Sequence, residues 1–395
     1  MREENQLKII CRIIDDYKGN QPFSRHLKDF FKAHPQMGSR DRRLASDFSY
    51  SFFRLGKAMR DSRMIERLTV ANFLCSAESN PLLDYCLEKF SFLKKSDVTL
   101  SLAGKIKLLQ DQYPGFNVNH IFPFKEHLSE NIDQDAFIRS FLSQPRLWIR
   151  MRKEFQNSVL EEMREKNILF EIDTVNPLSV SFKNMTALQN TDSFVKGYFE
   201  IQDWSSQQML NYTNPQPGES WWDACAGSGG KSLMMYDAEP TIRLLATDTR
   251  TSILENLESR FKKVGVKDYQ VQHVDLTKPL PDKIISQGFI EGSILADVPC
   301  SGSGTWGRTP EWLIFFNSDL ISRFVETQRS IVKHAVKGMK PGKSFVYSTC
   351  SVFREENEMN VEWIRSNTSL TLISSGYVEG AEKAADTMFA AQFRR

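Results

Sequence analysis

Residues 220–232 read SWWDACAGSGGKS, a short apolar run that leads into a turn rich in glycine. A P-loop would need glycine at position 225, where this chain has Cys225. The dinucleotide pattern G-x-G-x-x-G is also incomplete, because Ser232 stands at its third glycine. We therefore expect a strand, a glycine turn and a helix, where the backbone can approach a nucleoside-like ligand closely.

Strand-like and helix-like segments alternate from this turn to the C-terminus. The expected strands are LLATDT, YQVQHVDL, GSILADVPC and SFVYSTC, followed late in the chain by SLTLISS and TMFAAQFRR. The expected helices cover residues 251–264, 319–340 and 355–367. This alternation predicts an open, mostly parallel sheet with helices on both faces, which binds its ligand beyond the carboxyl ends of the strands.

Two further parts precede this sheet, which we assign to a domain at residues 202–395. Residues 1–138 are predicted to form an all-helical domain, and residues 1–70 hold fifteen Lys and Arg against nine Asp and Glu. A helix that begins near residue 39 has a basic face, which holds Arg40, Arg42, Arg43 and Arg54. It is either an amphipathic helix packed in a bundle or a helix whose arginines also contact phosphates, and both can hold at once. Residues 139–201 predict strand, helix, strand and strand, with a last strand at 198–203, as in a small α+β module of ferredoxin-like type.

Carboxylates stand at the ends of three successive strands. Asp223 ends the first strand, Asp248 the second and Asp275 the third. Any one of them could simply shape a turn. Three in succession favour a cofactor whose ribose hydroxyls bind Asp248 and whose adenine amino group binds Asp275. The sequence has no second phosphate-binding loop, so S-adenosylmethionine fits this pattern better than a dinucleotide.

Two of the six cysteines follow strands that should be neighbours. Cys300 follows GSILADVP and Cys350 follows SFVYST, so both thiols should open into one crevice. A thiolate there can add to C6 of a pyrimidine, which makes C5 nucleophilic enough to accept a methyl group. Asp297, three residues before Cys300, can hydrogen-bond N3 and the exocyclic amine of cytosine. On this pattern either thiol could attack.

The motifs DACAGSGGK, ATDTR, ADVPCSGSGT and YSTCS, in this order and spacing, resemble the Sun/Fmu family of RNA cytosine-C5 methyltransferases. The flanks FEIQDWSSQ, EENE and FAAQFRR agree, so that the resemblance covers residues 146–395. The stretch SRDRRLASDFSYSFFRLGK resembles the NusB-like RNA-binding domain of the bacterial 16S ribosomal RNA enzymes of this family. The resemblance implies a Rossmann-like class I methyltransferase sheet, a ferredoxin-like or RRM-like middle module and an all-α NusB-like N-terminal domain.

The resemblance also implies roles for individual residues. Cys350, in the T-C motif, would be the nucleophile, and Cys300 would assist release of the methylated product. The positions that match the family's cofactor site, which would hold S-adenosylmethionine, are Cys225, Ala226, Gly227, Ser228, Gly229, Gly230, Lys231, Asp248, Asp275 and Asp297. The family loop usually has alanine and proline where this chain has Gly227 and Ser228, and the loss of proline makes the free turn less rigid.

Two alternatives remain beside this reading. A DNA cytosine-C5 methyltransferase would use the Pro-Cys thiol, but that chemistry needs no second cysteine. An RNA-binding ribosome-assembly factor without catalysis would not require Asp297, Cys300 and Cys350 together.

The sequence also lacks features of other classes of protein. No apolar run could span a membrane, no signal peptide is expected at the start of the chain, and no Cys/His spacing suits a metal. Together with the RNA partner that the resemblance implies, these observations lead us to expect a cytoplasmic monomer that binds RNA, without a membrane or metal partner.

Overall fold

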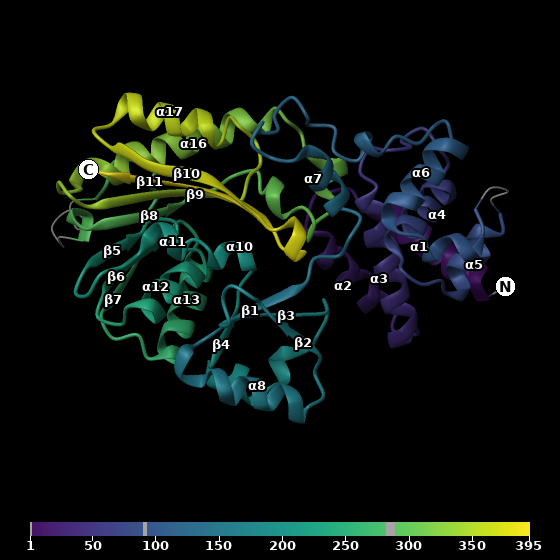
Figure 1. Cartoon of the computed structure of the whole chain (residues 1–395), viewed down its shortest axis with the longest axis horizontal. Coiled ribbons are helices and arrows are strands. Elements are labelled where there is room, and N and C mark those ends of the chain that lie inside the picture. The colour runs from purple at the N-terminus through teal and green to yellow at the C-terminus, as the bar shows by residue number, and fades with distance from the viewer. Residues whose placement is uncertain (1, 90–92, 282–288) are drawn as a thin grey trace. The chain divides into compact units, whose positions relative to one another are not determined.

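The computed structural model describes residues 2–89, 93–281 and 289–395 (Figure 1). The chain forms two compact units. The first comprises Met1–Glu126, Asp133–Gln144 and Trp306–Ser318, and the second comprises His127–Ile132, Pro145–Thr305 and Asp319–Arg395. The predicted middle module thus shares a unit with the large sheet, and the three-domain division at residues 138 and 201 stays a prediction.

The first unit consists of helices and loops among its described residues. Its helices are α1 (Arg2–Asp16), α2 (Phe23–Ala33), α3 (Ser39–Arg54), α4 (Met64–Cys75), α5 (Pro81–Leu87), α6 (Leu102–Gln112), α7 (Gln134–Ser140) and α15 (Trp312–Phe315). The longer ones bury one apolar face, as amphipathic helices do, except α4, in which residues 68–74 are all buried, so that it is covered on every side. Over the part of the chain that the structure describes, no helix is both long and apolar enough to cross a membrane.

One predicted phosphate contact on α3 is wrong. Arg54 is 4% exposed, and its Nη1 donates to the backbone carbonyls of Phe141 at 3.0 Å and Ser143 at 3.2 Å. The last turn of α3 packs inward, so this guanidinium satisfies buried carbonyls that would otherwise lack a donor. Arg40 and Arg43 are exposed, as the basic face requires.

The second unit is built on a seven-stranded sheet in the order β10-β11-β9-β8-β5-β6-β7. Its strands are β5 (Ser220–Asp223), β6 (Arg243–Asp248), β7 (Tyr269–His273), β8 (Ser293–Asp297), β9 (Ser344–Thr349), β10 (Thr371–Glu379) and β11 (Thr387–Arg394). The first five are parallel, whereas β11 runs antiparallel to β9 and β10. The chain order reverses beside β5, so a crevice is expected at the carboxyl ends of β5, β6 and β8.

Helices cover both faces of this sheet (Figure 1). One face packs on α16 (Leu320–Ala335) and α17 (Glu358–Asn367), and the other packs on α12 (Gly230–Ala238) and α13 (Thr251–Val264). Successive strand residues alternate between the two cores: Trp222 and Leu245 join the first, and Trp221 and Leu244 join the second. Helix α17 begins at Glu358, later than predicted, because the residues before it make tertiary hydrogen bonds.

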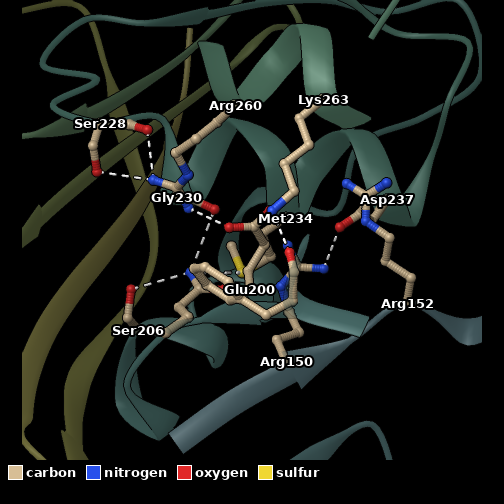
Figure 2. Close-up of polar contacts among 12 residues, drawn as sticks. Arg150, Arg152, Glu200, Ser206, Ser228, Gly230, Met234, Asp237, Arg260 and Lys263 are labelled. Carbon is tan, nitrogen blue, oxygen red and sulfur yellow. Dashed lines mark hydrogen bonds and ion pairs between the residues drawn. The ribbon is translucent and has the colours of Figure 1, made fainter. Parts of the chain in front are cut away.

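The predicted strands and helix of the small module are present. A four-stranded antiparallel sheet has the order β2-β3-β1-β4, formed by β1 (Leu147–Met151), β2 (Phe170–Ile172), β3 (Ser179–Phe182) and β4 (Phe199–Ile201). Helix α8 (Gln156–Glu165) and the short α9 (Asp192–Lys196) belong to it, and α10 (Trp204–Gln207) and α11 (Leu210–Thr213) lead into β5. Arg150 and Arg152 join this sheet to α12 through Asp237, at 2.5 and 3.2 Å (Figure 2).

Candidate active site

The glycine turn after β5 lies between β6 and two helices. Gly227 and Gly229 have φ of +52° and +81°, a region that side chains rarely tolerate. A Cβ on Gly229 would lie 2.8 Å from Leu257 Cγ and 2.9 Å from Phe261 Cε1, so α13 also requires glycine there. The amide of Ala226 donates to the carbonyl of Thr247 at 2.9 Å. The turn is therefore held against β6 and α13, and it ends at Gly230, where α12 begins.

A cavity of about 740 Å³ opens beside this turn, within the range typical of small-molecule sites. Nine of the predicted residues line it: Cys225, Ala226, Gly227, Ser228, Gly230, Lys231, Asp248, Asp275 and Asp297. Gly229 is not among the lining residues, because it faces Leu257 and Phe261. Val274, Leu276 and Ile331 supply an apolar wall suited to a flat ring.

Asp223 lines the same cavity and was not assigned to the site from sequence beyond its place at a strand end. Its side chain is buried, Oδ2 accepts from the Ser232 hydroxyl at 2.6 Å, and Oδ1 has no hydrogen-bond partner. Burial raises the pKa of Asp223 to about 7, although the Ser232 hydrogen bond opposes this shift. A buried oxygen without a partner is costly, so this wall of the cavity fits a ligand that brings a hydrogen-bond donor.

Asp248 is a carboxylate of the cavity that accepts four hydrogen bonds from the protein. The Gly227 amide donates to Oδ2 at 3.0 Å, and Arg250 donates to both oxygens through its amide, Nε and Nη2 at 2.9–3.0 Å. Burial would raise the pKa of Asp248, but the hydrogen bonds from Arg250 outweigh it and lower the pKa. A carboxylate offers about four lone-pair sites, so ribose hydroxyls would have to replace the Arg250 guanidinium. Arg250 was missed from sequence.

Asp275 lies in a turn at the edge of the cavity. Its Oδ1 accepts from the amide and the hydroxyl of Thr277 at 3.0 and 2.6 Å, and Lys278 forms an ion pair at 3.2 Å. These Thr277 hydrogen bonds are the main reason that the pKa of Asp275 is lowered. The carboxylate is thus ionised at neutral pH and can still accept from a ligand through its remaining lone pairs.

Asp297 ends β8 and lies between the cavity and the cysteines. Its Oδ2 accepts from Lys231 Nζ at 2.5 Å, and its Oδ1 accepts from the Ser348 hydroxyl at 2.8 Å. Burial works against the charge of Lys231, but Asp297 outweighs it and raises the pKa of this lysine. Lys231, in the first turn of α12, therefore remains a cation and fixes the orientation of the Asp297 carboxylate.

Cys300 and Cys350 lie together, as their places after neighbouring strands predict. Their Sγ atoms are 3.4 Å apart, and neither cysteine forms a disulfide. The hydrogen bond with Cys350, followed by burial, raises the pKa of Cys300 well above its usual value. The two thiols stand beyond Asp297 and are not part of the cavity lining, so the structure separates a ligand cavity from a thiol pair.

Glu356 holds the two cysteine loops together and was missed from sequence, where EENE served only as a flank. Its carboxylate is fully buried and accepts from the Ser301 amide at 2.9 Å, the Ser301 and Ser351 hydroxyls at 2.5 Å each, and Gln328 Nε2 at 2.9 Å. Burial raises the pKa of Glu356, whereas these hydrogen bonds act in the opposite direction. Ser301 follows Cys300 and Ser351 follows Cys350, so one carboxylate fixes both loops.

Comparison with known proteins agrees with this geometry. Residues 210–393 match the sequence profile of a family described as 16S rRNA methyltransferase RsmB/F. These residues belong to the RsmB/F methyltransferase family. The resemblance predicted from the four motifs is therefore confirmed, and the matched range contains the cavity loop, the three strand-end aspartates and both cysteines.

Curated relatives support the family assignment, and solved structures support the fold. A ribosomal RNA small subunit methyltransferase B from Shewanella oneidensis is 30% identical over 273 residues, which cover 67% of this chain and 57% of the relative. The chain thus spans little more than half the length of the curated relatives it matches. The crystal structure of protein PH0851 superposes with a TM-score of 0.72 at 20% identity, covering 95% of both chains. A methyltransferase homologue from Pyrococcus horikoshii gives 0.57 at 20% identity, covering 73% of this chain and 97% of its own.

Over the described residues, no group of three or more His, Cys, Asp and Glu side chains is arranged to hold a metal ion.

Proposed function

We propose that the chain transfers a methyl group from S-adenosylmethionine to C5 of a cytosine in RNA, with 16S ribosomal RNA as the substrate. The observation that carries this proposal is the pair of thiols, 3.4 Å apart, beyond an aspartate that borders a nucleoside-sized cavity. The family match over residues 210–393 and the relative from Shewanella oneidensis support the RNA substrate.

The cavity fits S-adenosylmethionine by its own chemistry. Asp248 would accept from the ribose hydroxyls, Asp275 from the adenine amino group, and the buried free oxygen of Asp223 from a donor on the ligand. The turn at Gly227 allows close approach of backbone to the ligand. When bound, the cofactor supplies an electrophilic methyl group.

The cysteines divide the remaining chemistry. Cys350 attacks C6 of the cytosine as a thiolate, which makes C5 a nucleophile for the methyl group, and methyl transfer to C5 releases S-adenosylhomocysteine. A base then takes the C5 proton, the C6–S bond breaks, and Cys350 leaves as a thiolate. Cys300 assists this release. The hydrogen bond with Cys350, followed by burial, raises the pKa of Cys300, which suits a neutral thiol that donates its S–H to the attacking Cys350 sulfur. Asp297, oriented by Lys231 and Ser348, would hydrogen-bond N3 and the exocyclic amine and favour addition.

RNA would be held by the parts that precede the large sheet. We assign this role to the NusB-like helical unit, through exposed basic residues of α3 such as Arg40 and Arg43, and to the ferredoxin-like or RRM-like small sheet. Contacts of this kind go mainly to phosphates, so binding should weaken steeply with salt. The cytosine must leave its stack to reach the thiols. We propose a monomer that acts in the cytoplasm.

The direct test incubates the purified chain with 16S ribosomal RNA and S-adenosylmethionine that carries a labelled methyl group. Label should appear in RNA, and nucleoside mass spectrometry should identify it as 5-methylcytidine. A matched duplex DNA of the same sequence serves as the control substrate. Label in DNA alone would replace the proposal with DNA cytosine methylation. Binding of RNA without any binding of S-adenosylhomocysteine would replace it with an assembly factor that has lost catalysis.

A further inference from the structure

Arg260 joins the cavity loop to the small sheet (Figure 2). Its Nη1 donates to the Ser228 carbonyl at 2.6 Å and to the Ser228 hydroxyl at 2.9 Å, and its Nη2 donates to Glu200 Oε2 at 2.7 Å. The Arg260 and Glu200 side chains are 25% and 11% exposed, so water screens this ion pair only partly. One guanidinium on α13 thus bridges the loop after β5 and strand β4.

The loop needs such a tie because its own sequence is flexible. Gly227-Ser228-Gly229 contains no proline and two glycines at positive φ, so the free backbone has many alternatives to the observed turn. The first half of the turn is anchored by the Gly227 amide on Asp248. The second half is anchored at Ser228, by Arg260, while Leu257 and Phe261 from the same face of α13 limit the space at Gly229.

We propose that Arg260 is a positioning residue for the cofactor. It fixes the turn at Ser228 in the form that lines the cavity, and Glu200 of the small sheet fixes Arg260 in turn. This inference rests on the proposed cofactor cavity, because the turn matters only if a ligand binds against it. The small sheet would then have two roles, since β4 would support the cofactor site as well as the proposed contact with RNA.

The attachment of the small sheet does not depend on Arg260. Arg150 and Arg152 bind Asp237 on α12 (Figure 2). Lys263 on α13 donates to the carbonyl of Phe194. Lys263 lies one turn beyond Arg260 on the same helix and contacts Phe194 of α9, in the module of the small sheet, without contacting the loop. Lys263→Met is therefore a matched control that removes a cation and a tie to the small sheet but leaves Ser228 anchored.

The test uses the full chain and S-adenosylhomocysteine as the probe, measured by titration calorimetry. Arg260→Met keeps the apolar stem of the side chain and should raise the Kd about tenfold, because two charge-assisted hydrogen bonds to the loop are lost. Lys263→Met should leave the Kd unchanged. In the protein without ligand, amide hydrogens at residues 225–231 should exchange faster in Arg260→Met than in Lys263→Met.

The double variant Glu200→Gln/Arg260→Met separates positioning from folding, because it leaves no unpaired carboxylate near β4. We expect the double variant to keep the melting temperature of the parent protein. The weakened binding and the faster exchange in the loop should nevertheless persist in it. Recovery of the parent Kd would overturn the inference, as would equal Kd values for Arg260→Met and the parent. If the parent protein itself does not bind S-adenosylhomocysteine, the proposed cofactor site fails, whatever the loop exchange shows.

Discussion

The ligand cavity and the thiol pair lie at the ends of neighbouring strands, yet different kinds of residue support them. In the cavity, Asp248 is held by Arg250, whose side chain is 63% exposed and can move aside. Behind the thiols, Glu356 is fully buried and binds four donors of the protein itself. A ligand can replace the partners in the cavity, whereas the loops of Cys300 and Cys350 are fixed before any substrate arrives.

The largest expected difference between the cavity and the thiol pair concerns the nucleophile, Cys350. Cys350→Ser should lower methyl transfer on the order of 10⁴-fold or more, because an alcohol at this position is a far weaker nucleophile than a thiolate. Binding of S-adenosylhomocysteine should be unchanged, since Cys350 does not line the cavity. Both quantities are measured on one preparation, by label incorporation and calorimetry. Cys11→Ser, in α1, is the matched control and should keep full activity.

Loss of the second thiol, that of Cys300, should block a later step of the reaction, the release of the product. Cys300→Ser should form the covalent adduct of Cys350 with RNA but release it slowly, so that a band of reduced mobility accumulates on a denaturing gel when RNA and cofactor are both present. The parent protein should show little of this band. If the band instead accumulates with Cys350→Ser, the two roles are exchanged, and Cys300 is the residue that attacks.

Substitution of Glu356 tests whether this buried carboxylate supports only the loops of the two thiols. Glu356→Ala leaves the Ser301 amide and one of the two N–H groups of Gln328 Nε2 without an acceptor, while the other N–H still donates to the Pro299 carbonyl. Each buried unpaired group costs about 1–3 kcal/mol. We expect kcat to fall about 10–100-fold through misplaced thiols, with the Kd of S-adenosylhomocysteine unchanged. Glu356→Gln keeps the shape and should lose less activity. A loss confined to cofactor affinity would show that the two regions are not supported separately.

The motifs predicted which residues lie at the cavity and at the thiol pair better than they predicted the residues that hold these in place. Alternating strands and helices were enough to place Asp248, Asp297, Cys300 and Cys350 at one edge of a sheet, because parallel strands bring their carboxyl ends together. Nothing in local sequence shows that Glu356, at a position predicted to be helical, reaches back to both cysteine loops.

Arg54 and Arg260 also make tertiary contacts that the local sequence does not predict. Both lie on amphipathic helices, where a basic residue is usually solvated. Arg54 is buried against carbonyls of the chain around α7, and Arg260 reaches a loop 32 residues earlier in the sequence. Periodicity assigns a residue to a helix face, but only the tertiary fold decides what that face meets. Sequence reasoning therefore gave Arg54 a wrong role and Arg260 none.

The smallest expected effect concerns Arg250, which occupies Asp248 where ribose hydroxyls would bind. Arg250→Ala should lower the Kd of S-adenosylhomocysteine by a few-fold, because displacing an exposed ion pair costs about 0–1 kcal/mol. The backbone amide of residue 250 would still donate to Asp248, so the carboxylate keeps its place. Titration of the parent and variant at low and high salt should show the gap closing as salt screens the ion pair. A higher Kd in the variant would mean that Arg250 contacts the ligand directly. The cavity would then be as fixed before binding as the loops of the thiol pair.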